Sequence, residues 1–333
     1  HIHEPRDYVR STRTMTNTIG IDVGGTSLRA SVVDDHGRIL DRERVPTPHS
    51  VHALEDALAA VVERLAKRQN VEAVGLAVAG FLNADRSIVR FAPHLPWRNA
   101  PVRERMERRL EMPVVVEHDC NSAAWGEYNY GASVGGNYVV TFAIGTGIGG
   151  ALIHNNELFR GAYGIAPEFG HLQVVPNGRP CPCGKIGCLE RYCSGTALVD
   201  TALELMVAHP DIPTMLGKDV TPESELTGRR VMEAARQNDR IAEMAVEDLG
   251  YWLGIGLATV ADVFDPDLIV VGGGVGSAGD LFLSHAREVY AQHVTGGGYR
   301  PLATIKQAEL GDDAGQVGAA DLARRYLLEQ CGN

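Results

Sequence analysis

The chain has 333 residues, of which 44% are hydrophobic and 22% charged, and 31 basic against 42 acidic side chains give a net charge of −11. This length predicts two globular domains, and the negative charge disfavours nucleic acid and anionic membranes as partners. Because the sequence has no apolar run of about 18 residues and no secretory signal, it predicts a cytoplasmic protein without a transmembrane helix. Residues 1–14, ahead of Met15, are expected to be a vector-derived or frayed extension outside the fold.

The first part of the chain alternates strand-like and helix-like segments. Two β-rich apolar runs flank a glycine pair in residues 17–34, which predicts a hairpin. Apolar residues at helical spacing predict a helix over residues 51–68. The other elements predicted in this part are strands over 38–47, 71–80 and 113–116 and a helix over 101–110.

A similar pattern starts again near residue 138. A strand over 138–144, a glycine-rich turn over 145–150 and a strand over 151–153 resemble the first hairpin, and this repeat after roughly 120 residues predicts two related halves. Strands that alternate with helices predict an α/β fold with mixed sheets. The remaining predicted elements are a strand over 268–271 and helices over 195–208, 228–236, 240–263, 278–293 and 315–328.

Three glycine-rich turns, within residues 22–26, 145–150 and 272–274, are candidates for holding a nucleotide. Glycine has no Cβ, so the backbone N–H groups of such turns can approach phosphate oxygens closely. Asp22 ends a strand beside the first turn, where a carboxylate can hold a hydrated Mg²⁺ against the phosphates. Each turn alone could equally be an ordinary tight turn, but the three together favour a nucleotide cleft.

The cysteines of residues 181–188 indicate a metal site. His171, Cys181, Cys183 and Cys188 offer one imidazole and three thiols, which is the donor set of a closed tetrahedral zinc site with a structural role. The alternative is a loop of free thiols, but free cysteine prefers apolar burial, and this loop is polar and rich in proline and glycine. The spacing therefore favours structural Zn²⁺.

The same segment resembles the ROK family (repressors, open reading frames, kinases) of the actin/Hsp70/sugar-kinase superfamily. The family motif is a glutamate and Gly-His, here Glu168 and Gly170-His171, followed by CxCGxxGCxE, here residues 181–190. The resemblance extends over most of the chain, from near residue 19 to near residue 325. Within the family, the chain is similar to the ATP-dependent glucokinases of actinobacteria.

This resemblance implies a two-domain actin-like ATPase fold, of the ribonuclease H-like kind, with a cleft for ATP and sugar between the domains. It assigns residues 15–118 and 315–333 to a small α/β domain. Residues 119–314, with the zinc loop 168–190, form the large α/β domain. Kinases of the family also lead us to expect a homodimer or homotetramer.

By resemblance, the glycine turns hold ATP together with Mg²⁺. The first turn is then the first phosphate loop, the second turn is the second phosphate loop, and the third lies beside adenine and ribose. The expected nucleotide contacts are Asp22, Gly24, Gly25, Thr26, Gly145, Thr146, Gly147, Gly273 and Gly274.

The resemblance further implies ATP-dependent phosphorylation of glucose to glucose 6-phosphate. Phosphoryl transfer needs a base near the attacking hydroxyl, and Asp119 follows a strand where a βα junction would present it at the edge of a sheet. From its position alone, Asp119 could instead cap a helix that begins near Asn121; the resemblance favours the base. The residues expected to bind the sugar are Gly80, Asn99, His118, Asp119, Glu168, His171 and Glu190.

Two residues depart from the family pattern and leave alternatives open. His118 stands where the family commonly has Asn, and Ser27 stands where many members have Lys. Other acceptors are N-acetylmannosamine, fructose or allose, and inorganic polyphosphate is an alternative donor. A sugar-sensing ROK regulator is a further alternative, which the negative charge and the short segment ahead of residue 19 disfavour.

Overall fold

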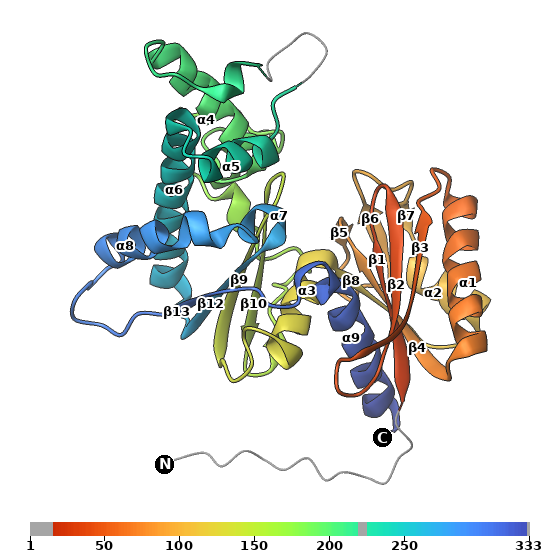
Figure 1. Ribbon diagram of the computed structural model, residues 1–333. Coiled ribbons are helices and arrows are strands. Elements are labelled where there is room, and N and C mark those ends of the chain that lie inside the picture. The colour runs from red at the N-terminus through yellow and green to blue at the C-terminus, as the bar shows by residue number, and fades with distance from the viewer. Residues whose placement is uncertain (1–15, 219–224, 332–333) are drawn as a thin grey trace.

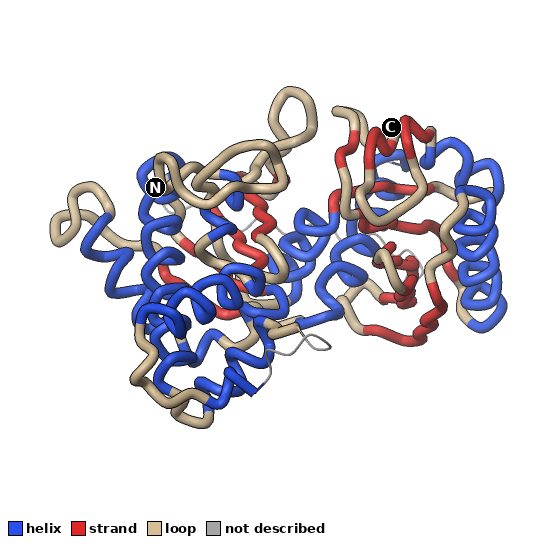
Figure 2. The backbone as a smooth tube through the Cα atoms, turned by 90° about the horizontal axis from the view of Figure 1, so that it is seen from above, coloured by secondary structure: helices blue, strands red, loops and turns tan. Residues whose placement is uncertain are grey.

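The computed structural model describes residues 16–218 and 225–331. The expected N-terminal extension, residues 1–14, lies outside the described residues. Two sheets occupy separate lobes, and helices α3 (Asp119–Tyr130) and α9 (Ala314–Cys331) lie between them (Figure 1). Figure 2 shows the same two lobes from above.

Within the described part of the chain, the strands form two five-stranded sheets and one three-stranded sheet. The first sheet has the order β3-β2-β1-β4-β8, and the second has the order β11-β10-β9-β12-β13. The first three strands of each order pair antiparallel, and the last two join in parallel. This repeated strand order confirms the prediction of two related halves.

The bounds of the strands follow the predicted elements closely in the first half. The first sheet contains β1 (Asn17–Val23), β2 (Ser27–Val33), β3 (Ile39–Pro46), β4 (Val71–Val78) and β8 (Val114–His118). The second contains β9 (Tyr138–Ile144), β10 (Ile148–His154), β11 (Glu157–Leu158), β12 (Leu268–Gly272) and β13 (Thr304–Gln307). The small sheet consists of β5 (Phe81–Leu82), β6 (Val89–Phe91) and β7 (Arg98–Ala100), which are too short for a sequence pattern to indicate.

Helix α1 (Val51–Arg68) covers the first sheet on the side away from α9 (Figure 1). The Ser50 side chain caps its first turn, and Leu54, Leu58 and Leu65 are wholly buried on the first sheet. Burial of each such leucine stabilises the fold by about 1.5–3 kcal/mol. The other helices are α2 (Val102–Leu110), α4 (Gly195–Ala208), α5 (Gly228–Arg236), α6 (Arg240–Phe264), α7 (Gly273–Gly276) and α8 (Leu283–His293).

Two boundaries differ from those predicted. The strand expected over 151–153 already begins at Ile148, because Gly149 and Gly150 lie against Cys120 and Phe169, where a Cβ would have no room. The helix expected over 278–293 is interrupted, because the chain makes a 3₁₀ turn before α8 begins. Across residues 16–218 and 225–331, the helices found are too short or too polar to cross a membrane.

The parallel strands of each sheet end at the same edge. In the first sheet, Val23 of β1 pairs with Val78 of β4, and Val78 pairs with His118 of β8. The first glycine turn and Asp119 therefore follow strands that end at the same edge of the sheet, with β4 between them. In open α/β sheets, this carboxyl edge is where ligands bind.

Helix α9 approaches its neighbours so closely that only glycine fits at the contacts. A Cβ on Gly20 of β1 or on Gly75 of β4 would lie 1.7 Å or 1.9 Å from a carbonyl oxygen of α9. A Cβ on Gly318 of α9 would lie 1.6 Å from the Ser122 carbonyl oxygen of α3. The position of α3, which begins with Asp119, thus depends on glycines in α9 and the first sheet.

We predict that Gly318→Ala destabilises the chain, whereas Gly315→Ala does not. The added methyl group at residue 318 would force α3 and α9 apart, and overpacking of this kind costs about 1–3 kcal/mol. A Cβ on Gly315, in the same helix, meets nothing within 4 Å, so alanine there should be neutral or stabilising by up to about 1 kcal/mol. Urea unfolding of both variants measures the difference, and equal stabilities would contradict this packing.

Candidate active site

The first glycine turn joins β1 to β2 and lies beside a partly buried carboxylate. The turn is closed by a hydrogen bond from Gly24 N to Ser27 O of 3.2 Å, and the Thr26 side chain is exposed. Asp22, at the end of β1, pairs with Arg29 of β2. Burial raises the pKa of Asp22, the Arg29 guanidinium opposes this, and the charge of Asp119 raises it further.

The second glycine turn joins β9 to β10 and faces the first turn of α4. The Gly195 N–H donates to the Gly145 carbonyl oxygen at 2.8 Å, and the Thr196 hydroxyl donates to the Thr146 carbonyl oxygen at 2.8 Å. Helix α4 has no acidic residue in its first turn. Its positive end therefore stays available to an anion held at this glycine turn.

A pocket of about 1050 Å³ opens beside the second and third glycine turns. Gly273 has a φ of +87°, and a Cβ there would lie 2.4 Å from the Ile144 carbonyl oxygen, so only glycine fits. Gly274 faces open space within the pocket. The residues that line the pocket include Gly145, Thr146, Gly195, Thr196, Thr227, Gly228, Gly274, Val275 and Ser277.

Asp119 is the first residue of α3 and does not cap it. The cap is His118, whose Nδ1 accepts from the Cys120 N–H at 3.2 Å. The alternative reading of Asp119 as the N-cap of a helix near Asn121 is therefore wrong. Asp119 Oδ1 also accepts from the Cys120 N–H, at 2.8 Å, and its side chain is 38% exposed, so a ligand can reach the carboxylate.

Asp119 interacts electrostatically with acidic groups on both sides of the site. Its charge raises the pKa of Asp22, beside the first glycine turn, for which burial is the larger cause. Partial burial also raises the pKa of Glu168, while His118 and His171 lower it and the charges of Glu190 and Asp119 raise it. Asp119 follows β8 at the edge where β1 also ends, and its neighbour His118 lines one cavity with Glu168.

A narrow cavity brings several of the expected sugar ligands together from both halves. It is lined by Gly80 and His118 of the first half and by Gly150 and Glu168 of the second, with Asn121 of α3. The backbone carbonyl of Phe91 would meet a Cβ on Gly80 at 2.6 Å. Asn99 is not among these lining residues; it lies exposed on β7.

The four predicted metal ligands lie together. Their donor atoms all fall within 4.8 Å of one another, with Cys181 Sγ 3.6 Å from His171 Nδ1 and Cys183 Sγ 3.7 Å from Cys188 Sγ. Tetrahedral bonds of about 2.3 Å from zinc to sulfur would place two sulfurs about 3.8 Å apart. The donor set and spacing therefore fit a zinc ion.

Glycines shape the loop around this cluster. Gly184 and Gly187 both have a positive φ, of +93° and +75°. A Cβ on Gly187 would lie 1.7 Å from the Val175 carbonyl oxygen. Both positions therefore favour glycine.

His171 and Glu190 connect the cysteine cluster to the rest of the site. The Nδ1 atom of His171 faces Cys181, and its Nε2 atom lies 4.0 Å from Glu168 Oε2. Glu190 Oε2 accepts from the Ile148 N–H at 3.1 Å, and Glu190 Oε1 lies 3.7 Å from Cys181 Sγ. The glutamate therefore ties the second glycine hairpin to the cluster.

The sequence of residues 18–326 matches the sequence model of the ROK family. The chain belongs to the ROK family. It is 46% identical over 310 residues to the glucokinase of Streptomyces coelicolor, covering 92% of this chain and 97% of that protein. The predicted family resemblance is thereby confirmed.

Solved structures of ROK proteins share the fold. A glucokinase from Streptomyces griseus, in complex with glucose and AMPPNP, is 45% identical with a TM-score of 0.80, and the match covers 93% of this chain and 99% of that one. A ROK hexokinase from Thermus thermophilus is 31% identical with a TM-score of 0.78, covering 94% and 100%. These matches confirm the predicted two-domain actin-like fold.

Some residues of the site were not found from the sequence of this ROK protein. The first turns of α4 and α5, with Gly195, Thr196 and Gly228, line the large pocket. In the sequence they lie far from the glycine turns. A Ser or Thr cap before each helix was the available signal, and Ser194 and Thr227 do cap them. Only the folded chain brings these helix ends to the pocket.

Proposed function

We propose that this chain transfers the γ-phosphoryl group of ATP to the 6-hydroxyl of glucose, with Asp119 as the general base. The observation that carries this proposal is the position of Asp119, at the sheet edge where β1 ends with Asp22 and Val23 and next to His118, which lines one cavity together with Glu168. The glucokinases at 45–46% identity support it. Glucose 6-phosphate and ADP are then the products.

ATP binds with its adenosine in the large pocket and its phosphates between the two glycine turns. The pocket of about 1050 Å³ has ample room for a nucleoside. Backbone N–H groups of the turns and the positive end of α4 neutralise part of the phosphate charge. The contacts assigned to ATP are Asp22, Gly24, Gly25, Thr26, Gly145, Thr146, Gly147, Gly273 and Gly274.

Mg²⁺ enters with ATP as part of the substrate complex. Asp22 is the candidate carboxylate to hold it through water, and Arg29 beside it supplies a cation near the loop where Ser27 replaces the lysine of many family members. Before ATP binds, the positive charge of Arg29 offsets the repulsion between the carboxylates of Asp22 and Asp119.

Glucose binds at the narrow cavity, whose volume of about 10 Å³ must increase to admit a sugar, and carboxylates and imidazoles there can fix the directions of its hydroxyl groups. The sugar ligands are then Gly80, His118, Glu168, His171 and Glu190, and Asn99 joins them only if the small sheet moves towards the cavity. Asp119 accepts the proton of the 6-hydroxyl as that oxygen attacks the γ-phosphorus in line with the departing ADP. Closure of the two halves keeps water from taking the phosphoryl group.

Zinc has a structural role in this proposal. His171, Cys181, Cys183 and Cys188 would hold it in a closed coordination sphere. With His171 Nδ1 on the metal, its Nε2 atom faces Glu168 and is free to hydrogen-bond a sugar hydroxyl. The division into a small domain (15–118 with 315–333) and a large domain (119–314) likewise stays a proposal, as does a homodimer or homotetramer.

We predict that Asp119→Asn lowers kcat by about 10²–10⁴-fold. The amide keeps the shape of the side chain but accepts no proton, so binding of glucose should change far less than turnover. A coupled assay for ADP release measures kcat, and calorimetry measures glucose binding.

Asp211→Asn is the matched control for this prediction. Asp211 is exposed in the turn after α4 and is not among the residues assigned to either substrate, so the same change of side chain there should leave kcat at the wild-type value. Full activity of Asp119→Asn would contradict the role of Asp119 as base.

We predict that Gly274→Leu raises the KM for ATP at least about tenfold, which corresponds to about 1.4 kcal/mol. Its side chain would enter the open space of the large pocket and compete with adenosine, whereas Gly274→Ala should have a smaller effect. The KM for glucose should not change. If both variants have the wild-type KM for ATP, the assignment of this pocket to adenosine is wrong.

We predict that Cys188→Ser abolishes zinc binding and lowers the melting temperature, because a structural zinc site contributes directly to folding free energy. Elemental analysis of the purified wild type should find one zinc per chain. Cys331→Ser, at an exposed cysteine outside the cluster, should keep the metal and the melting temperature. A metal-free wild type that is fully stable would overturn the zinc assignment.

A further inference from the structure

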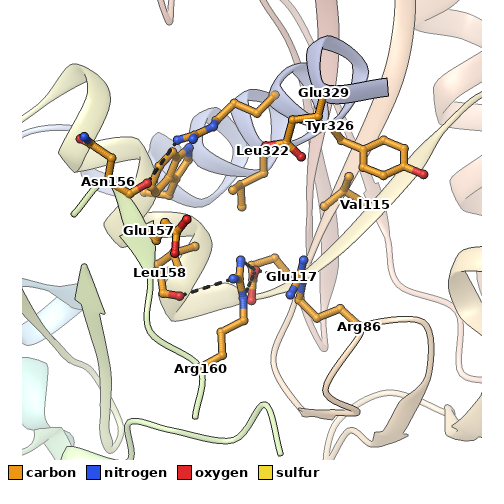
Figure 3. A pocket seen from close by; sticks show the side chains of 12 residues that line it. Arg86, Val115, Glu117, Asn156, Glu157, Leu158, Arg160, Leu322, Tyr326 and Glu329 are labelled. Carbon is orange, nitrogen blue, oxygen red and sulfur yellow. Dashed lines mark hydrogen bonds and ion pairs between the residues drawn. The ribbon is translucent and has the colours of Figure 1, made fainter. Parts of the chain in front are cut away.

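A buried ion pair joins the two halves directly behind Asp119. Glu117 of β8, in the first half, is 1% exposed. Arg160, which follows β11 of the second half, donates to Glu117 Oε2 from Nε at 3.0 Å and from Nη2 at 2.6 Å. Figure 3 shows the Arg160 and Arg86 side chains meeting at Glu117.

The other oxygen of Glu117 holds the segment that carries Asp119. Glu117 Oε1 accepts from the His118 N–H at 3.0 Å and from Asn121 Nδ2 at 3.1 Å. These two donors lie on either side of Asp119 in the chain. Since Arg160 holds one oxygen and the first turn of α3 holds the other, a rotation of this carboxylate would disturb both sets of contacts.

Arg160 also closes the segment that leads to Glu168. Its carbonyl oxygen accepts from the Ala166 N–H at 3.1 Å, which fixes a loop of residues 161–166 against the cavity lined by Gly164 and Glu168. Arg160 thus contacts the loop beside the sugar cavity through its backbone and contacts Glu117, next to the candidate base, through its guanidinium.

We propose that Arg160 is a positioning residue that sets the orientation of Asp119 through Glu117 when the two halves come together. This inference rests on the proposed function, in which Asp119 is the base. A buried carboxylate requires a partner, and Arg160 is the partner from the second half. The alignment of the base therefore depends on how the second half is placed.

The surroundings of the pair allow Arg160 to be changed without unfolding the chain. Arg86, from the first half, lies 3.5 Å from the same oxygen of Glu117, so the carboxylate keeps a cation when Arg160 is lost. A cavity of about 320 Å³ adjoins the pair, so a shorter side chain meets no tight packing there. Arg160→Gln is thus expected to fold while the link between the halves is broken.

The test compares Arg160→Gln, Arg160→Lys and Glu117→Gln with a matched control, Arg325→Gln. Arg325 lines the same cavity, but its guanidinium lies over the Trp125 ring, 4.6 Å from the centroid. Each full-length variant is assayed for kcat and KM with Mg²⁺–ATP and glucose. Glucose affinity is measured by calorimetry, and melting temperature reports folding.

Arg160→Gln should lower kcat by about 10- to 100-fold, as a misplaced reacting group does, while glucose affinity changes by less than about threefold. Arg160→Lys should recover part of the loss, and Arg325→Gln should match the wild type. The double variant E117Q/R160Q should lose no more than the larger single loss, because both changes break the same pair.

Wild-type kcat in Arg160→Gln, or losses that multiply in the double variant, would overturn the inference while leaving the proposed function standing. An equal loss in kcat and in glucose affinity would also overturn it, since it would indicate damage to the whole site. If Arg160→Gln fails to fold, Arg160→Lys and Glu117→Gln provide the test. A lower kcat with nearly unchanged glucose affinity in these variants would then support the inference, and a wild-type kcat would overturn it. A wild-type chain without kinase activity would overturn the proposed function, and this inference with it.

Discussion

The close approach of α9 to the first sheet and to α3 is the constraint on which the rest of the structure depends. It is possible only because Gly20, Gly75 and Gly318 offer no Cβ at the contacts. These contacts hold α9 against β1 and β4 of the first sheet. They also hold α3 against α9. Since Asp119 is the first residue of α3, the position of the candidate base depends on the backbone contacts between α3 and α9 and not on loops at the surface.

The electrostatics of the site explain how a chain with a net charge of −11 can bind an anionic nucleotide. Burial raises the pKa of Asp22 and of Glu168, and the charge of Asp119 adds to both shifts. In the proposed binding mode, uncharged groups would meet the phosphates: the glycine turns and the first turn of α4, which carries no acidic residue. The attraction for ATP would then be local, and a divalent cation would be needed where the phosphates approach the carboxylates.

Features that are local in sequence could be predicted, and features made by tertiary contacts could not. The cysteine cluster and both glycine hairpins lie within short segments, so spacing and residue type were sufficient to indicate them. The repeat of strand order followed from the similar hairpins. In contrast, the pair of Glu117 with Arg160 joins residues that are 43 positions apart, and no periodicity indicates it. Asn99 was predicted from resemblance to belong to the sugar site, yet it lies exposed on a strand of three residues and outside the cavity.

The most direct test of the central claim is a coupled assay for ADP release, with Mg²⁺–ATP as donor and a panel of glucose, mannose, fructose, N-acetylglucosamine, N-acetylmannosamine and allose as acceptors. The proposal predicts that glucose gives by far the highest kcat/KM and that glucose 6-phosphate is the product. A higher kcat/KM for another sugar would show that this sugar, and not glucose, is the preferred acceptor. Binding of glucose without any turnover, with ATP or with inorganic polyphosphate, would contradict the assignment as a kinase.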